Sequence, residues 1–375
     1  MSQPTSSSPN SNPVLFVQPA PPPPSLFSRA FHWFMRSFFL LSLLLNVLLL
    51  MYVANELAVD GNVREAYYAG HTQAEGKIAI VRIEGAIVEG FTSFAHQQLR
   101  RAARDEHVKA VVLAIDSPGG TVTASDELYH ACVQLREGKL PGQKQPKPLV
   151  VSMGSVAASG GYYVAVAAET IFAQPTTLTG SIGVYAQLFD VSELAAKHGI
   201  GLNMIKKGEL KGSGSPFHKM RAEEEREFSE LLEHAYQRFM AVVTEGRSQP
   251  GGKQRLKAGL RDEIALETLT MPKTRYVRRL ADGGGWTAAQ ALEYGLIDQI
   301  GYLHDAVEAA ARRVGTDLTS IRVVRYQRPT TFLDSLLGMR SEPPTTGLRL
   351  RDVPGATARL WYLMPGFELE GIVWR

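Results

Sequence analysis

Residues 37–55 form an uncharged run of 19 residues, and no other feature constrains this chain as strongly. A helix of that length covers about 28 Å at a rise of about 1.5 Å per residue, close to the roughly 30 Å of a bilayer's hydrocarbon core. A cleavable signal peptide needs a short positive start and a shorter apolar run, whereas 36 residues come first here. We therefore expect an uncleaved transmembrane helix.

The charges that flank this run predict its orientation. Arg29 and Arg36 precede it, and Glu56 and Asp60 follow it. Because positive residues stay on the cytoplasmic side of a membrane, we expect a cytoplasmic N-terminus and an exported main domain. In a bacterium with two membranes, this predicts a single-pass protein of the cell inner membrane whose main domain lies in the periplasm.

Composition marks the boundaries on either side of the anchor. Residues 1–36 are rich in Pro and Ser, with eight of the chain's 21 prolines before position 29, so we expect a disordered cytoplasmic tail. Residues 56–76, with scattered glycines, have the composition of a linker. We expect one main domain over 77–326 and a loose C-terminal extension over 327–375, which begins with a stretch rich in Pro, Thr and Arg.

Charge and cysteine content exclude several classes of protein. Lys and Arg total 40 against 37 Asp and Glu, and the net charge of +3 gives no clustered basic face for nucleic acid. The single cysteine, Cys132, rules out a disulfide framework within the chain and any cysteine-rich zinc site. We expect Cys132 to be a small core residue, and we predict no metal ion and no cofactor.

Within the main domain, short apolar runs alternate with segments of helical spacing. Continuous apolar strands are typical of sheets covered on both faces, and helices between them indicate parallel crossover units. We therefore predict an α/β fold with a mostly parallel sheet. The expected strands are residues 78–83, 86–88, 108–115, 148–153 and 321–326, and the expected helices are residues 91–104, a segment ending near 136, 156–168, 221–244, 287–294 and 303–313.

Three glycine-bearing turns adjoin apolar strands, at residues 116–120, 154–161 and 179–183. In parallel sheets, reactive groups collect where the strands end. Ser159 lies in the second turn, at the start of an expected helix, where the helix dipole and free backbone N–H groups favour a developing oxyanion. Ser159 is therefore a candidate nucleophile. The alternative is that the small residues around it only let the helix approach the sheet closely.

A serine nucleophile needs a base, and the histidines do not supply a convincing one. No histidine lies between Ser159 and His198, and His198 fits a solvated helix end. His218 follows Pro216 in a loop, and nothing in the sequence supports a role for it. A serine–histidine–aspartate triad is therefore not predicted.

Lysine is the other base that can activate a serine. Lys211 lies in a polar, glycine-containing loop that follows the apolar residues 202–205. A free lysine side chain has a pKa of about 10.4, and lowering it to about 7 takes roughly 4 kcal/mol of desolvation or hydrogen bonding to the neutral amine. A dry site could supply this, so Ser159 and Lys211 are a hypothetical pair. The alternative is that Lys211 is a simple loop cation.

Five motifs in this order resemble the signal peptide peptidase A family, in its short bacterial form with one anchor and one catalytic domain. The resemblance covers residues 77–315. The motifs are the glycine turn at 116–120, the nucleophile segment at 150–163, the Thr-Gly-Ser-Ile-Gly-Val segment at 179–184, the lysine at 211 and the segment from Trp286 to Asp298.

This resemblance implies a Clp-protease/crotonase-like fold of repeated β-β-α units and a serine endopeptidase with a serine–lysine dyad. Ser159 would be the nucleophile and Lys211 the general base, while Ser181 would hold the lysine amine toward Ser159. Backbone N–H groups would bind the oxyanion, those of Gly119, Gly120 and Gly160. The alternatives are that Ser181 is an ordinary turn serine and that the glycines only form tight turns.

The resemblance also implies substrates and partners. The substrates would be extended apolar peptides, such as remnant signal peptides in the membrane. The chains would assemble into a homo-oligomeric ring, in which Ser159 and Lys211 can come from neighbouring protomers.

Two other functions stay open at this point. A crotonase-like acyl-CoA enzyme would use a carboxylate base and would give Lys211 no role, but CoA is cytoplasmic and the main domain is expected to be exported. A non-catalytic oligomeric membrane scaffold would keep the fold without needing the reactive residues.

Overall fold

The computed structural model of this chain describes residues 26–59, 63–248, 255–268, 271–328 and 361–363. The chain divides into two compact units, one ending at Asp60 and one beginning at Gly61, and each is described by itself. The first unit contains a single described element, a long helix. The second contains a mixed sheet with helices on both faces.

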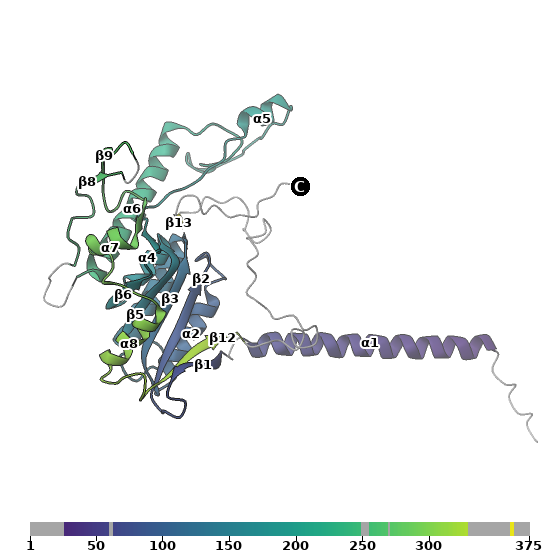
Figure 1. Cartoon of the computed structure of the whole chain (residues 1–375). Coiled ribbons are helices and arrows are strands. Elements are labelled where there is room, and N and C mark those ends of the chain that lie inside the picture. The colour runs from purple at the N-terminus through teal and green to yellow at the C-terminus, as the bar shows by residue number, and fades with distance from the viewer. Residues whose placement is uncertain (1–25, 60–62, 249–254, 269–270, 329–360, 364–375) are drawn as a thin grey trace, which may run out of the picture. The chain divides into compact units, whose positions relative to one another are not determined.

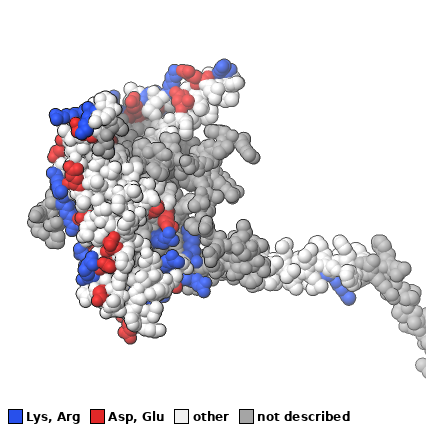
Figure 2. Space-filling view, viewed as in Figure 1, with Lys and Arg blue, Asp and Glu red and all other residues white. Residues whose placement is uncertain are grey.

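The helix of the first unit is α1, Leu26–Val59 (Figure 1). Within it, Phe31–Met51 is long and apolar enough to cross a membrane. Figure 2 shows its described surface almost free of charge. The helix includes residues 26–36, which the composition places in the disordered tail, because no proline follows Pro24 to interrupt it. The rest of the predicted tail lies outside the described residues.

The second unit is built on a nine-stranded sheet. Its strands β12, β2, β3, β5, β6 and β11 lie side by side in that order and are parallel, which confirms the mostly parallel sheet. Strand β7 pairs parallel with β5, while β1 and β10 add antiparallel partners to β12 and β7. The bounds are β1 (Arg64–Gly70), β2 (Lys77–Glu84), β3 (Val108–Ser117), β5 (Leu149–Ala158), β6 (Thr170–Ala173), β7 (Leu178–Gly180), β10 (Gly285–Thr287), β11 (Gln299–Ile300) and β12 (Arg322–Gln327).

Two further strand pairs lie outside this sheet, and both are antiparallel. They are β4 (Gly119–Thr121) with β13 (Trp361–Leu363), and β8 (Ile264–Glu267) with β9 (Arg275–Arg278). The described helices of this unit are α2 (Ser93–Arg104), α3 (Val122–Glu137), α4 (Gly160–Ala165), α5 (Ser192–Lys197), α6 (Ala222–Gly246), α7 (Ala288–Glu293) and α8 (Leu303–Arg313).

Helices bury both faces of the sheet, which explains why its central strands are almost continuously apolar. Successive side chains of a strand point to opposite faces. In β2, Ala79 and Val81 belong to the core that includes α2, α3 and α4. Ile78 and Ile80 belong to a second core, which α8 covers. Cys132 is fully buried in α3, as predicted, and burial raises the pKa of its thiol to about 12.

Several local predictions differ from the structure because strand pairing is not visible in composition. The expected linker contains β1, whose backbone pairs with the distant strand β12. The helix expected at 156–168 begins only at Gly160, because β5 continues to Ala158 along β7. The expected strand 86–88 is reduced to one bridge, between Ile87 and Gly120. Of the expected C-terminal extension, the structure describes 361–363 as β13 and residues 327–328, and the other residues lie outside it.

A buried lysine caps the C-terminal end of α2. The side chain of Lys147 is 1% exposed, and its amine donates hydrogen bonds to the carbonyl oxygens of Ala102 and Asp105, each at 2.5 Å. These carbonyls lie at the C-terminal end of α2, where backbone acceptors lack helical partners. Burial lowers the pKa of Lys147 to about 8. The neutral amine still has two N–H donors, enough for both carbonyls.

The Lys147→Met variant should be less stable than the wild type by about 1–3 kcal/mol at pH 8, because the buried carbonyl of Ala102 loses its lysine donor and that of Asp105 keeps only the amide of Val108. Between the folded pKa of about 8 and the unfolded value of about 10.4, the unfolded lysine binds a proton that the folded one has released. The contribution of Lys147 to stability therefore rises with pH. Denaturant unfolding of both proteins in detergent measures this, and a stability gap that narrows toward pH 10 would contradict it.

Candidate active site

The pairing of β5 with β7 places two serines side by side. Ala158 and Gly180 are register partners, and each is the last residue of its strand. Ser159 and Ser181 follow them directly, and the amide of Ser159 donates to the carbonyl of Gly180 at 2.7 Å. The two candidate residues therefore meet at the carboxyl edge of the sheet, where sequence reasoning expected chemistry.

Both serines are held in an unfavourable backbone conformation. Ser159 has a φ of 53° and a ψ of −116°, and Ser181 has a φ of 51°. They are the two residues other than glycine with positive φ in the described part of the chain. A side chain in such a region costs about 1–3 kcal/mol, and such strain persists only where the surroundings impose it, often at functional sites.

The hydroxyl of Ser159 has no hydrogen-bond partner among the residues that the structure describes. The residue is 1% exposed, and its Oγ is buried without a hydrogen bond. Buried polar atoms are usually paired, so an unpaired hydroxyl in a strained turn is one that the fold keeps available. It lies at the N-cap of α4 but makes no capping bond.

Glycines let the backbone close tightly around this hydroxyl. A Cβ on Gly160 would lie 2.4 Å from Ser125 Oγ and 3.1 Å from the amide nitrogen of Gly120. A Cβ on Gly120 would lie 1.8 Å from the carbonyl oxygen of Ile87. Both positions therefore require glycine, and the backbones of Gly120 and Gly160 are neighbours beside Ser159.

The backbone of β4 presents only one of its two glycine amides. Gly119 donates its N–H to Ser117 Oγ at 3.1 Å and accepts from the amide of Ile87 at 2.8 Å. Ile87 in turn accepts from the amide of Thr121 at 2.9 Å. Because successive backbone groups alternate along a strand, the N–H and C=O of Gly120 face away from Ile87.

The other side of β4 is occupied by β13. The register pairs Trp361 with Thr121, Tyr362 with Gly120, and Leu363 with Gly119. An extended segment of the chain itself therefore lies antiparallel on the strand that carries the Gly120 amide. Sequence reasoning missed this contact, because a three-residue strand has no periodicity and its partner is more than 200 positions away.

The loop before β10 fixes Ser181. Ser181 Oγ donates to the carbonyl of Gly283 at 2.7 Å, and its amide donates to the carbonyl of Gly284 at 3.2 Å. The buried ring of Trp286 packs against the preceding strand end, since a Cβ on Gly180 would lie 2.6 Å from its Cδ1. In the sequence, residues 283–285 are simply three consecutive glycines.

An ion pair braces this loop. The guanidinium of Arg278 lies 4.1 Å from the ring centre of Trp286 and pairs with Asp282 at 2.7 Å. Burial opposes ionisation of Asp282, but hydrogen bonds from Arg278 and from the Gly284 amide hold the pKa of this carboxyl below its ordinary value. Arg278 thus contacts both ends of the loop that orients Ser181, Asp282 at one end and Trp286 at the other.

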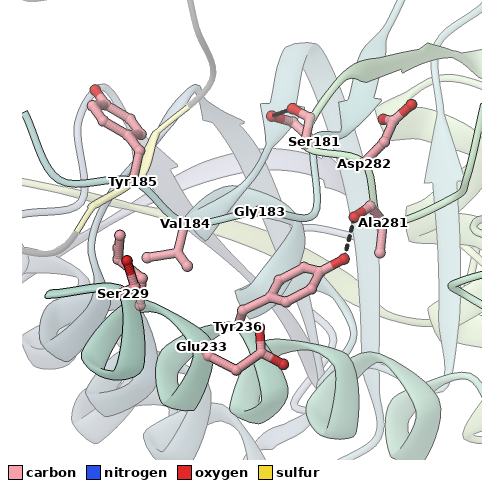
Figure 3. A pocket seen from close by; sticks show the side chains of 11 residues that line it. Ser181, Gly183, Val184, Tyr185, Ser229, Glu233, Tyr236, Ala281 and Asp282 are labelled. Atoms are coloured by element: carbon pink, nitrogen blue, oxygen red, sulfur yellow. Dashed lines mark hydrogen bonds between the residues drawn. The ribbon is translucent and has the colours of Figure 1, made fainter. Parts of the chain in front are cut away.

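A cavity of about 460 Å³ opens beside Ser181. Figure 3 shows Tyr236 reaching from α6 to the carbonyl of Ala281, to which its hydroxyl donates. Val184 and Leu232 line an apolar part, and Glu233 contributes a carboxylate. The cavity is large enough for one long side chain next to the Ser181 hydroxyl.

Lys211 is not part of this cluster within one chain. It is exposed in a turn, where its amide donates to the carbonyl of Gly208 at 3.2 Å. It lines a separate cavity of about 480 Å³ with Glu227 and Phe228 of α6. Among the contacts of the described residues, none joins the Lys211 amine to Ser159 or Ser181.

The rejected histidines have structural surroundings of their own. His198 is the exposed C-cap residue of α5, in agreement with a solvated helix end. His218 contacts the carbonyls of Lys219 and Gly212 and lies 3.8 Å from the carboxylate of Glu224. Sequence reasoning missed Glu224, which is fully buried although it lies in a run of three glutamates that indicated only a helix start.

Comparison with known proteins decides the family. The profile of peptidase family S49 matches residues 142–258 and 269–317, a span that includes Ser159, Ser181 and Lys211. A Synechocystis protein named as a protease is 31% identical over 274 residues, which cover 73% of this chain and 87% of the relative. The chain belongs to peptidase family S49.

Other relatives of this family member are longer. A protein of Enterococcus faecium named as signal peptide peptidase SppA is 34% identical over 64% of this chain and 61% of its own length. Protease 4 of Haemophilus influenzae is 32% identical over 65% of this chain but only 36% of its own length. Among solved structures, a mutant of the 1510-N membrane-bound stomatin-specific protease aligns with 67% of this chain and 98% of its own, at 15% identity. Its TM-score of 0.38 is too low to establish a shared fold.

The strain at Ser159 predicts an unusual stability order. Ser159→Gly should be more stable than Ser159→Ala, by up to about 1–2 kcal/mol, because glycine relieves a strain of about 1–3 kcal/mol at a backbone entropy cost of about 0.5–1 kcal/mol. Ser155, on the same strand and outside the positive-φ positions, is the matched control, and there the alanine variant should be the more stable. Thermal unfolding of the four variants measures both differences. Equal stability orders at the two positions would contradict a strained turn.

Proposed function

We propose that this chain is a membrane-anchored serine endopeptidase whose nucleophile is Ser159. The observation that carries the proposal is the buried, unpartnered hydroxyl of Ser159 in a strained turn, beside glycine backbones that admit a substrate carbonyl. Membership of peptidase family S49 supports the same activity. The finer fold assignment, repeated β-β-α units of the Clp-protease/crotonase type, is proposed with it and is supported by the parallel sheet.

The oxyanion would be bound by the backbone amides of Gly120 and Gly160. The N–H of Gly120 faces away from Ile87, and Gly160 adjoins it at the start of α4, where the first amides have no helical partner. Donors that are fixed before the reaction stabilise developing charge without reorganising. The amide of Gly119 already donates to Ser117, so Gly119 would supply the turn and not a donor.

Lys211 would be the general base, oriented by Ser181. The hydroxyl of Ser181 donates to Gly283, which leaves its oxygen lone pairs free to accept a hydrogen bond from a lysine amine. The cavity beside Ser181 gives such an amine a partly apolar approach, and loss of water favours the neutral form.

The lysine would come from a neighbouring copy of the chain in a homo-oligomeric ring. Lys211 lies on the arm, which we define as residues 186–221. The arm carries large apolar side chains that are exposed in one chain, and such a surface is typical of an interface. These side chains are Phe189, Leu194, Ile200, Leu202, Met204, Ile205, Leu210, Phe217 and Met220.

The chemical steps then follow from these positions. Neutral Lys211 takes the proton of Ser159 Oγ as that oxygen attacks a peptide carbonyl, and the amides of Gly120 and Gly160 bind the resulting oxyanion. The protonated lysine gives its proton to the leaving amine, and an acyl-enzyme remains. The lysine next takes a proton from water as the water oxygen attacks the acyl-enzyme ester. The Ser159 oxygen then leaves the acyl carbon and receives that proton from the lysine.

The substrate would bind as an extended strand along β4. The pairing of β13 with β4 supports this mode, because a segment of this chain already adds a strand there through its backbone. Apolar peptides such as remnant signal peptides are the proposed substrates. The apolar helix α1 would hold the domain beside the inner membrane on its periplasmic side, where such peptides are released.

The dyad is tested by purifying Ser159→Ala and Lys211→Ala with the full-length wild type and measuring cleavage of an extended apolar peptide. In both variants kcat should fall by at least about 1,000-fold. When two residues act as one catalytic unit, removing either one costs about as much as removing both. Lys207→Ala removes a nearby loop cation and is the matched control. Wild-type turnover by either dyad variant would end the proposal.

A fluorophosphonate probe distinguishes the alternative functions. A peptidase should be labelled at Ser159 in the wild type and not in Ser159→Ala. A crotonase-like acyl-CoA enzyme or a non-catalytic scaffold should not be labelled at this residue. Absence of label on a folded wild-type protein would favour those two alternatives.

The pairing of β13 predicts an effect on substrate binding. A peptide must replace β13 on β4 before it can bind. Tyr362→Pro removes one backbone N–H from β13 and so weakens this competing strand. KM should therefore fall by about 2- to 10-fold, which corresponds to the free energy of one backbone hydrogen bond. Leu363→Pro is the control, since the N–H of Leu363 alternates to the opposite side from that of Tyr362. An unchanged KM in Tyr362→Pro, or equal effects of both prolines, would show that β13 does not compete with the peptide.

A further inference from the structure

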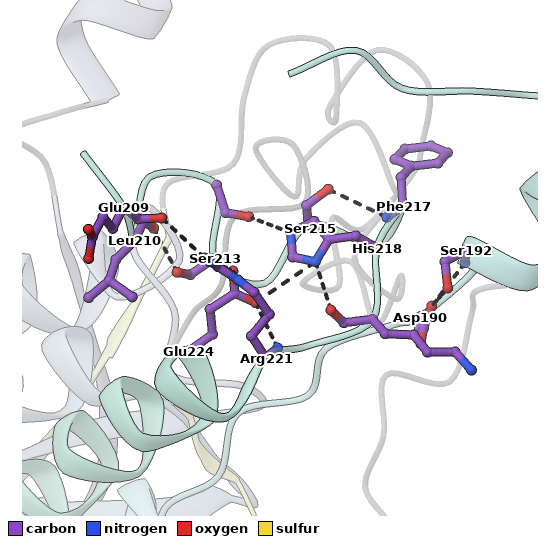
Figure 4. A network of polar contacts seen from close by, with 12 residues as sticks. Asp190, Ser192, Glu209, Leu210, Ser213, Ser215, Phe217, His218, Arg221 and Glu224 are labelled. Carbon is purple, nitrogen blue, oxygen red and sulfur yellow. Dashed lines mark hydrogen bonds and ion pairs between the residues drawn. The ribbon is translucent and has the colours of Figure 1, made fainter. Parts of the chain in front are cut away.

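Two side chains from the segment just before α6, those of His218 and Arg221, hold the loop of Lys211 on both sides (Figure 4). Before the lysine, the carbonyl of Glu209 accepts from Arg221 Nη2 at 3.1 Å. After it, the carbonyl of Gly212 lies 3.3 Å from His218 Nε2. The backbone two positions before Lys211 and one position after it is therefore held by the short segment that leads into α6.

Glu224 organises both of these side chains. Its carboxylate accepts from the Nε and Nη2 of Arg221 at 3.0 and 2.7 Å and from the Arg221 amide at 3.2 Å. It also lies 3.8 Å from His218 Nδ1. Burial opposes ionisation of Glu224, yet the hydrogen bonds and charge of Arg221 hold the pKa of this carboxyl below its ordinary value. A fully buried carboxylate such as that of Glu224 is costly unless it is paired in this way.

The ring of His218 lies between two backbone carbonyls. Its Nδ1 lies 2.9 Å from the carbonyl of Lys219, and its Nε2 faces the carbonyl of Gly212. The charged groups around it are Glu224 on α6, Arg221 just before α6, Asp190 before α5, and the adjacent Lys219.

We propose that His218, Arg221 and Glu224 form a lysine latch, which fixes the backbone on both sides of Lys211 so that its amine is delivered in one position. The three are positioning residues, because they act on the loop and do not touch substrate. The inference rests on the proposed role of Lys211 as general base. Its physical reason is that an error of about 1 Å in the position of a reacting group can cost about 100-fold in rate.

The experiment compares Arg221→Gln and Glu224→Gln with Lys219→Gln in the full-length protein. Lys219 forms an exposed ion pair with Glu193 on the same arm, at 2.6 Å, so Lys219→Gln is matched in charge to Arg221→Gln. Arg221→Gln and Glu224→Gln should lower kcat by about 10- to 100-fold with KM little changed, because the base is misplaced while the peptide site is intact. Lys219→Gln should keep wild-type kinetics.

Amide hydrogen exchange measures the latch without relying on activity. In the wild type, the amides of Lys211 and Ser213, which donate to Gly208 and Leu210, should exchange more slowly than those of residues 201–205. Arg221→Gln and Glu224→Gln should raise exchange in residues 208–213 alone. Should both variants fail to fold, equal exchange rates of the two segments in the wild type would still overturn the latch.

The outcomes separate the latch from the proposed function. Wild-type kcat in Arg221→Gln and Glu224→Gln, with Lys211→Ala inactive, would overturn the latch and leave the dyad standing. An active Lys211→Ala would overturn the proposed function and the latch with it. A kcat loss in Lys219→Gln as large as that in Arg221→Gln would also overturn the latch, because it would assign the effect to the charge of the arm.

Discussion

The register of β5 against β7 is the constraint on which the rest of the site depends. It aligns Ala158 with Gly180, and so brings the two serines that follow them to one point on the sheet edge. A shift of one residue would turn every side chain of the strand to the opposite face. The buried neighbours of β5 forbid that shift, because its residues pack alternately into two separate cores.

That register is maintained against local strain. A serine with positive φ lowers the stability of the folded chain. Two such serines at adjacent strand ends persist only because other parts of the structure hold their backbones in place. The support comes from the loop before β10, whose carbonyls bind Ser181, and from the buried indole of Trp286 behind Gly180. Arg278 and Asp282 tie this loop in turn. The downstream segment, remote in sequence, is therefore part of the same structural unit as the two serines.

The molecule divides its candidate chemistry between a rigid part and an exposed part. The hydroxyl of Ser159 and the glycine amides belong to the buried sheet edge, whereas Lys211 belongs to an arm with an apolar surface. A general base on such an exposed arm acts from one position only if the backbone around it has a fixed conformation. The hydrogen bonds from Arg221 and His218 to the lysine loop supply this order, and a buried carboxylate holds them in place.

The sequence by itself determined the features that depend on neighbouring residues. The uncharged apolar run predicted the long helix, and short apolar runs predicted the parallel strands of the core. A glycine-bearing turn led to Ser159, and the family resemblance led to Ser181. Only the tertiary structure decided which distant segments meet: β1 with β12, β13 with β4, and Arg221 with the carbonyl of Glu209 in the lysine loop. Residue patterns report which groups are apolar or turn-forming over a few positions. Backbone pairing and buried ion pairs depend on partners that only folding brings together.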